Sequence, residues 1–446
     1  MYEDHLVLYL IIYAVIVMIM LLASFNRRMP SVGIPLAFTF NLLMNHYFGA
    51  LIYALPWYST EGYEFTYLGF EQTLYGMAAF AAGSLMIGPW IIANFSGRPS
   101  NVIIKPHPKL VTRYFQIGLI TYFLLGPILG RIPTFATFVQ SAWNLLIVSV
   151  CLLCWKAWTE RKLFLIPIYL ALSAVFPFFT SFNSGFLNYG IRALMAVLFF
   201  VATFFKPRWL VVMMVIVSVY MGLSLCETYF RDRDELREAI WHGELSASQR
   251  IERVLWTLTH FEWLDLTNQK HLKRIDGRLN QNDFVGKSIV YLGDDREAFA
   301  RGSTFSDAII ALIPRFFWPN KPFYAGSGDL VTRYTGQQLS ETTSFGIGYV
   351  MEFYINFGTP CVVIGFLILG VLIRIFDFKA ARRLVRGNWQ GFTLWFLPAC
   401  GLTETVDTIP AIAASVIAAI IFCVFIHRFL LRTFLGLRFV FGGRKI

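Results

Sequence analysis

The chain has 446 residues, of which 57% are hydrophobic, 17% aromatic and only 15% charged. Soluble domains carry about 25% charged residues, so this composition excludes a protein whose main environment is water. The net charge is +11. The distribution of the basic residues along the chain indicates whether this charge faces a membrane surface or binds nucleic acid.

Long apolar runs recur along most of the chain, and each is long enough to cross about 30 Å of hydrocarbon. A segment that spans the bilayer satisfies its own backbone hydrogen bonds when it is helical. The sequence therefore predicts an all-α polytopic membrane protein with about eleven transmembrane helices. The predicted spans are 6–24, 32–56, 71–94, 114–131, 134–155, 163–180, 188–205, 209–226, 346–373, 391–408 and 409–428.

Basic residues concentrate on alternate connections between these spans. The basic connections hold 21 Lys and Arg against two acidic residues, Glu160 and Asp377. They are 26–28, 97–113, 156–162, 206–208, 374–386 and the tail from Arg428. Because cytoplasmic loops carry the Lys and Arg excess, the N-terminus is predicted outside and the C-terminus inside. The positive charge then faces anionic lipids, and nucleic acid is not a predicted partner.

One connection is far longer than the others. Residues 227–345 hold 15 Lys and Arg against 17 Asp and Glu, and we predict a large, mostly helical external loop before the last three spans. Such a long insertion is usually functional. The predicted organisation is an N-terminal membrane bundle (1–226), the external loop with the candidate site (227–345), and C-terminal membrane helices with a basic tail (346–446). Within the loop, helical spacing predicts a helix over 246–266, and 304–317 reads as an apolar half-helix closed by Pro314.

The stretch "IPRFFWPNKPFYAG" at 313–326 sets two cations among aromatics and prolines. Prolines fix a pre-set turn, and aromatic rings such as Trp318 and Tyr324 suit a membrane interface. Arg315 and Lys321 would project from this frame at headgroup height, where arginine binds phosphate oxygens bidentately. The functional interpretation is a clamp for an anionic head, and the alternative is an aromatic belt with two snorkelling cations.

Further ionisable residues follow this stretch. Asp329, Arg333 and Glu341 lie in polar surroundings, and Glu352 lies just inside the next predicted span. An ionisable group within a membrane helix costs on the order of 3 kcal/mol and is a functional hypothesis by default. Arg192, in the seventh span, is predicted as its partner or as a second phosphate ligand, with snorkelling to the interface as the alternative.

"IPRFFWPNKP", the Thr- and Ser-rich stretch after it and "GYVMEFYINFG" resemble a known family. They are similar to the oligosaccharide repeat-unit polymerases of bacterial surface polysaccharides, the Wzy-type O-antigen polymerases. That family carries an arginine followed after ten residues by glycine in a late external loop, and Arg315 and Gly326 have this spacing. The motifs occupy about 310–358, while the topology matches over the whole chain. A second such pair, which some members carry in an earlier loop, is missing.

The resemblance implies a glycosyltransferase of the bacterial inner membrane, with its large loop periplasmic and without cofactor or metal. The donor would be a glycan on undecaprenyl pyrophosphate, and the acceptor a hydroxyl of a second lipid-linked repeat unit. The implied partners are this lipid-linked oligosaccharide, bilayer lipids, a flippase and a chain-length regulator.

A pyrophosphate leaving group needs preorganised cations, each worth ~3–4 kcal/mol. The candidates are Arg315, Lys321 and Arg333. The acceptor hydroxyl needs a general base. The candidates, in order, are Glu352, Asp329 and Glu341. Inverting and retaining chemistry both stay open.

Three alternatives compete with polymerisation. A flippase predicts internal repeats and charges along a central path, which the sequence lacks. A ligase that moves glycan onto a lipid A-type acceptor would share the cationic clamp. A membrane acyltransferase would need a buried histidine, and His46 is the one candidate well inside a predicted span. His242, His260 and His271 show no metal-ligand spacing.

Overall fold

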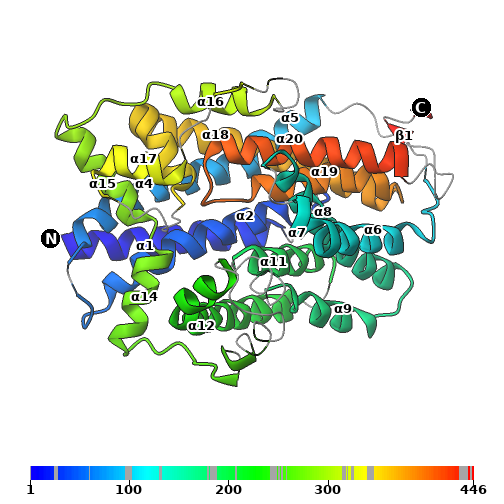
Figure 1. The fold of residues 1–446 in the computed structure, drawn as a ribbon, viewed down its shortest axis with the longest axis horizontal. Coiled ribbons are helices and arrows are strands. Elements are labelled where there is room, and N and C mark those ends of the chain that lie inside the picture. The colour runs from blue at the N-terminus through cyan, green and yellow to red at the C-terminus, as the bar shows by residue number, and fades with distance from the viewer. Residues whose placement is uncertain are drawn as a thin grey trace. The chain divides into compact units, whose positions relative to one another are not determined.

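The computed structural model describes residues 2–24, 29–59, 61–95, 103–129, 133–177, 180, 188–205, 208–241, 249, 252, 255–257, 259–313, 318, 320–322, 326–338, 346–430, 440–441 and 444–445. Its regular elements are helices, apart from the two-residue strands β1 (Val440–Phe441) and β2 (Arg444–Lys445) (Figure 1). Among these residues, five helices are long and apolar enough to cross a membrane. The prediction of an all-α membrane protein is confirmed in this coarse form.

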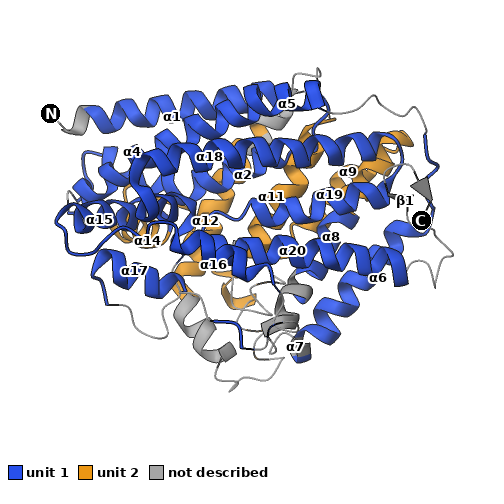
Figure 2. Ribbon diagram, turned by 90° about the horizontal axis from the view of Figure 1, so that it is seen from above, with its two compact units in different colours: residues 1–149, 279–446 blue, residues 150–278 orange. Residues whose placement is uncertain are grey.

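The chain divides into two compact units, residues 1–149 with 279–446 and residues 150–278 (Figure 2). The first unit begins with α1 (Tyr2–Ser24) and continues through α2 (Ile34–Leu42), η1 (Leu43–Tyr47), α3 (Phe48–Leu51), η2 (Ile52–Ala54), α4 (Tyr63–Ala82), η3 (Gly83–Ile87), α5 (Gly88–Phe95), α6 (Leu110–Leu119), η4 (Ile120–Leu125) and α7 (Gly126–Leu129). Helix α8 (Pro133–Thr159) passes from the first unit into the second. The second unit contains α9 (Leu165–Ser173), α11 (Asn188–Ala202), α12 (Arg208–Trp241) and α14 (Gln269–Leu279).

The rest of the first unit holds α15 (Asn282–Gly293), α16 (Ser303–Ala311), α17 (Ser327–Thr335), α18 (Gly348–Val385), α19 (Trp389–Leu402), α20 (Ile409–Phe425) and η5 (Ile426–Leu430). Each predicted span contains helical residues, but α9 and α19 are shorter than the spans predicted at 163–180 and 391–408. The helices long and apolar enough to cross a bilayer are His5–Ser24, Tyr63–Phe95, Ser141–Thr159, Gly348–Val385 and Ile409–Phe429. Leu110–Leu125 and Tyr189–Ala202 are shorter apolar helices.

Glycines allow helix backbones to approach closely in the first unit. A Cβ at Gly370 of α18 would lie 2.4 Å from the carbonyl oxygen of Phe80 in α4. A Cβ at Gly286 of α15 would lie 1.9 Å from the carbonyl oxygen of Phe65, also in α4. Helix α4 is therefore the element against which both α15 and α18 pack.

One local prediction is wrong. Residues 261–265 are not helical, so the helix predicted over 246–266 does not continue to Leu266. Side chains of α12 supply their hydrogen-bond partners, because the N–H of Glu262 donates to Thr228 Oγ1 (3.0 Å) and that of Leu264 to Ser224 Oγ (3.0 Å).

The connection predicted at 374–386 is helical, because α18 continues as far as Val385. Here Asp377 is buried, and its Oδ1 accepts from the N–H of Val32 (2.9 Å) and of Ile34 (3.3 Å) at the start of α2. Arg374 donates to its other oxygen at 2.7 Å. These bonds stabilise the extra helical turns, because they satisfy both the buried carboxylate and orphan donors of α2.

Candidate functional site

Glu352 lies in the first turns of α18 and is completely buried. Its Oε2 accepts a hydrogen bond of 2.6 Å from the N–H of Ile409, the first residue of α20. Its Oε1 makes no hydrogen bond of ordinary geometry to a described residue, and the hydroxyl of Thr304 in α16 interacts with the carboxyl group. A helix N-terminus favours negative charge, so the fold supports a buried carboxylate here and leaves one oxygen able to accept a proton.

Helix α18 is broken directly after this acid. Phe357 (φ −146°, ψ 26°) and Gly358 (φ 68°, ψ −159°) leave helical geometry, and the positive φ explains a glycine at 358. At the break, the N–H of Ala300 donates to the carbonyl of Ile355 at 2.8 Å and that of Arg301 to the carbonyl of Asn356 at 3.3 Å. The segment before α16 therefore docks on the break.

Asn356 fixes this docking through its side chain. Its Nδ2 donates to Thr304 Oγ1 at 2.8 Å, and its Oδ1 accepts from the N–H of Gly302 at 2.9 Å. Helix α16 consequently packs against both α18 and α20, as Figure 1 shows. The half-helix predicted in the loop lies directly over the break in the membrane helix.

An apolar groove of about 440 Å³ opens beside the break. Its walls include Phe305 of α16 and, from α18, Phe353, Phe357, Cys361, Ile364 and Ile368. Phe357 is 53% exposed and Ile364 57%, so the groove is open on one side. A groove lined wholly by apolar groups suits a hydrocarbon chain and not a sugar.

Asp307 lies on the same side of α16 as Thr304, because residues three apart are neighbours on a helix. It is half-buried, and its negative charge acts on Glu352. Burial raises the pKa of Asp307 above its ordinary value. Sequence analysis missed Thr304 and Asp307, because the sequence of the half-helix gives no sign of the helix on which it packs.

Two predicted cations and one predicted acid have structural partners. Lys321 is buried, and its Nζ donates to the carbonyl oxygens of Ala311 (3.2 Å) and Ile313 (3.1 Å) at the end of α16. The lysine thus stabilises the negative end of the α16 dipole. Arg333 of α17 pairs with Glu297 at 3.1 Å. Asp329 accepts from the N–H of Gly326 at 2.9 Å and thereby caps α17.

The remaining predicted site residues are Trp318, Arg192, Arg315, Tyr324 and Glu341. Trp318 is 39% exposed. Arg192 belongs to the second unit, where its Cζ lies 4.9 Å from the ring centroid of Tyr189. The predicted residues Arg315, Tyr324 and Glu341 lie outside the described part of the chain.

His46 is buried in a polar cluster that ties α15 to η1 and α4. Its Nδ1 lies 2.8 Å from Asn282 Oδ1 and 3.0 Å from Thr73 Oγ1, and Asn282 Nδ2 donates to the carbonyl of His46 at 2.7 Å. These partners are neutral, and a catalytic histidine is normally oriented by a carboxylate. The cluster therefore anchors the loop helix to the bundle.

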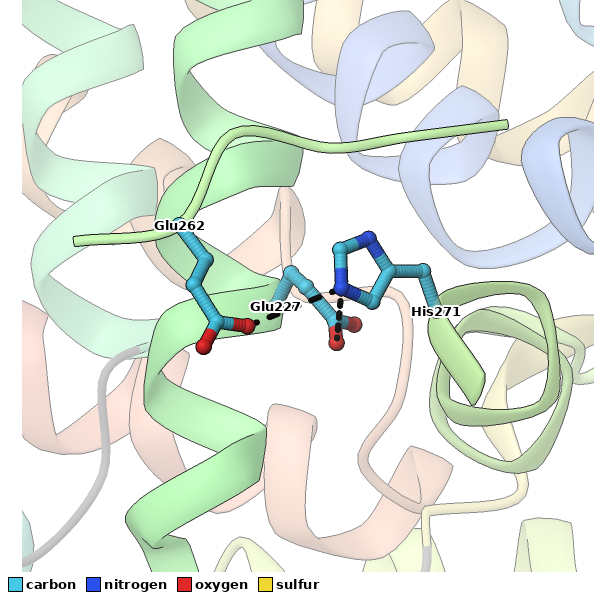
Figure 3. Close-up of side chains that lie close together, drawn as sticks. All are labelled: Glu227, Glu262 and His271. Carbon is cyan, nitrogen blue, oxygen red and sulfur yellow. Dashed lines mark ion pairs between the residues drawn. The ribbon is translucent and has the colours of Figure 1, made fainter. Parts of the chain in front are cut away.

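In the second unit, Glu227, Glu262 and His271 lie close together (Figure 3). Nε2 of His271 is 3.6 Å from Oε1 of Glu227 and 3.6 Å from Oε2 of Glu262. The backbone N–H of Asp265 donates to the other ring nitrogen, Nδ1, at 3.1 Å. A neutral imidazole that accepts at Nδ1 carries its proton on Nε2. Nε2 therefore points a proton at the carboxylates, and its lone pair is not available to a metal ion.

Arginines neutralise the same two carboxylates. Arg274 is hydrogen-bonded to Glu227, and Arg231 lies 2.6 Å from Glu262. Burial raises the pKa of Glu227, while Arg274 opposes that shift. The geometry fits an ion-pair network that fastens residues 260–271 to α12 better than it fits a metal centre. The sequence did not predict this network, because Glu227, Glu262 and His271 come close together only in the folded structure.

Residues 72–433 match a family described as a domain of unknown function (DUF8712). The match covers most of the chain. No curated protein and no solved structure matches it.

Proposed function

We propose that this chain, which belongs to the DUF8712 family of domains of unknown function, polymerises lipid-linked oligosaccharide repeat units. The reaction moves a glycan from a polyprenyl pyrophosphate onto a hydroxyl of a second lipid-linked unit. The observation that carries the proposal is the buried carboxylate of Glu352, next in sequence to Phe353, which lines an apolar groove beside the break in a membrane helix. The resemblance of residues 310–358 to repeat-unit polymerases supports it.

In this proposal Glu352 is the general base. The acceptor O–H bond breaks, its proton passes to Oε1 of Glu352, and the oxygen attacks the anomeric carbon as the bond to pyrophosphate breaks. Correctly placed general bases contribute roughly 10²- to 10⁴-fold in rate. The N–H of Ile409, at the N-terminus of α20, donates to Oε2 and so favours the anionic form, against the effect of burial. The apolar groove accommodates part of a polyprenyl tail.

The leaving pyrophosphate needs cations, and Arg315 is the first candidate because of its spacing from Gly326. Lys321 contributes by holding the end of α16, through its bonds to Ala311 and Ile313. The proposal includes the finer topology: eleven spans in a bacterial inner membrane, with the N-terminus and the loop at 227–345 periplasmic.

The test compares Glu352→Gln with wild-type protein in a deletion strain, with membrane levels measured by immunoblot. Glutamine keeps an acceptor for the N–H of Ile409, so folding is retained while the base is lost. We expect the long-chain polysaccharide ladder to disappear, with single repeat units still exported. Glu71→Gln is the matched control, since Glu71 is also a carboxylate within an apolar helix, where it accepts from Tyr9 (3.0 Å) and Tyr75 (2.9 Å).

Other outcomes point elsewhere. A full ladder from Glu352→Gln contradicts its role as base. Repeat units trapped on the cytoplasmic side of the deletion strain indicate a flippase, and long polymer that stays on its lipid carrier indicates a ligase. Loss of the ladder in Arg315→Ala protein that reaches normal membrane levels would support the pyrophosphate clamp.

A further inference from the structure

Helix α16 lies within the loop predicted to be external, yet it packs on helices of the membrane domain. It contacts α18 and α20, and both are long and apolar enough to cross a bilayer. In Figures 1 and 2 it runs lengthwise beside α20 and not across its end. Its nine residues extend about 14 Å, roughly half the thickness of the hydrocarbon core. We propose that α16 is a half-helix embedded in the bilayer, with its last turn in contact with hydrocarbon.

The last turn of α16 and the two residues after it expose an apolar face. Ile309 is 67% exposed, and Leu312 and Ile313, three and four residues later on the same face, are exposed as well. Ser306, which is exposed, and Asp307, which is half-buried, precede this face. The helix therefore has a polar beginning and an apolar end. This gradient suits a helix that enters hydrocarbon from the polar boundary of a bilayer.

The apolar face of α16 is continuous with the surface of α18. Phe305 precedes Ile309 by one helical turn and lines the groove beside the break together with Ile364 and Ile368 of α18. These two isoleucines are exposed. Exposed aliphatic side chains on a membrane-crossing helix contact lipid tails, which are as apolar as they are. The same hydrocarbon is therefore the occupant that fits the face of α16.

The backbone at the end of α16 also fits a position without water. The last carbonyl groups of a helix have no donor within the helix, and in hydrocarbon the protein itself must supply one. The oxygens of Ala311 and Ile313 accept from the buried Nζ of Lys321, at 3.2 and 3.1 Å. The oxygen of Ile309 accepts from the N–H of Leu312 at 3.2 Å. Protein donors thus replace solvent at this helix end.

The inference goes beyond the proposed function and does not depend on it. It moves part of the predicted external loop into the membrane. The groove between α16 and α18 then opens to the lipid phase, so a molecule that occupies it enters from the bilayer and not from water.

The experiment measures the surroundings of α16 in the purified full-length protein, in nanodiscs of phosphatidylethanolamine and phosphatidylglycerol. Ile309 is replaced by p-acetylphenylalanine, to which a ketone-reactive nitroxide is attached, so the six cysteines stay unchanged. Electron paramagnetic resonance with power saturation gives two collision rates of the nitroxide. One is with oxygen, which concentrates in hydrocarbon, and the other with a polar nickel chelate, which stays in water. The same label at Ile364 is the lipid-facing control, and at the exposed Asp294, after α15, the aqueous control.

We expect the ratio of oxygen to nickel collisions at residue 309 to equal that at 364 and to exceed that at 294 by about tenfold or more, because a polar reagent enters hydrocarbon unfavourably. A nickel collision rate as high as at 294 would place α16 in water and overturn the proposal. Low rates with both reagents would show that another part of the protein, or a second copy, covers the face, and would overturn it equally.

A label at Leu312, on the same face, repeats the measurement if the variant at Ile309 does not fold. No sugar substrate is used, so these outcomes are independent of whether Glu352 acts as a base. A lipid-exposed α16 in a protein that makes no polymer would leave this inference standing and remove the proposed function alone.

Discussion

Gly326, which the sequence pairs with Arg315, is the N-cap residue of α17 and has φ −74° and ψ 172°. Any residue adopts this extended conformation. A Cβ at this position would meet only the side-chain oxygen of Asp329, at 3.6 Å, among the described residues. Neither backbone geometry nor packing in the described structure therefore requires a glycine here. If the spacing of Arg315 and Gly326 has a role, that role is in binding a substrate and not in stabilising the fold.

Gly326→Ala is accordingly predicted to leave thermal stability in detergent unchanged, within about 0.5 kcal/mol. The same substitution is predicted to reduce polysaccharide chain length, because a methyl group would obstruct the substrate at the loop. Gly328→Ala is the control, since a Cβ there has nothing within 4 Å. A normal ladder from Gly326→Ala would remove this glycine from the site, and a lower melting temperature would show that the described packing is incomplete there.

At the scale of elements, α15 and α4 meet through two reciprocal contacts. A Cβ at Gly286 would lie 1.9 Å from the carbonyl of Phe65, and one at Gly69 would lie 2.0 Å from the carbonyl of Asn282. Backbone atoms cannot move aside as a flexible side chain can. The position of α15, and of the loop that follows it, thus depends on these glycines.

We expect Gly286→Ala to destabilise the protein by about 3 kcal/mol or more, because overpacking against backbone is at the severe end of its range. Gly293→Ala, at the end of the same helix, adds a methyl group in open space and should leave the unfolding transition unchanged. Thermal unfolding of the two purified variants measures the difference. Equal melting temperatures would mean that α15 does not pack as closely on α4 as the structure shows.

Apolar runs predicted where the helices lie, because hydrocarbon demands long apolar helices. They did not predict where a helix breaks or continues. The break at Phe357–Gly358 depends on donors from residues 300–302, and the continuation of α18 to Val385 depends on the bonds of Asp377 to α2. Such partners are distant in sequence, so a single run of residues carries no sign of them.

At the scale of the whole molecule, the candidate site was predictable in part. Glu352 was identified because an ionisable residue inside an apolar run is costly. Asp307 and Thr304 were not, because their value depends on the packing of α16 against α18. The bonds of Lys321 to Ala311 and Ile313 could not be predicted either. A lysine among aromatic residues can bind a lipid headgroup or the C-terminal carbonyl groups of a helix, and the sequence does not distinguish the two. The sequence shows which ionisable residues are unusual in their apolar surroundings, and only the fold shows which of them lie close together.

The charge distribution over the whole chain makes a prediction about orientation. If basic connections stay in the cytoplasm, residues 156–162 lie inside and residues 294–297, in the long loop, lie outside. Alkaline phosphatase, which is active only outside the cytoplasm, is fused after residue 162 and after residue 297. We expect an inactive first fusion and an active second one, with a fluorescent protein on the C-terminal tail showing that it is cytoplasmic. The reverse activities would invert the topology and place Glu352 and Asp307 near the cytoplasmic face. Equal activities would mean an even number of crossings between the two points, against the three predicted there, and would remove or add a span between residues 162 and 297.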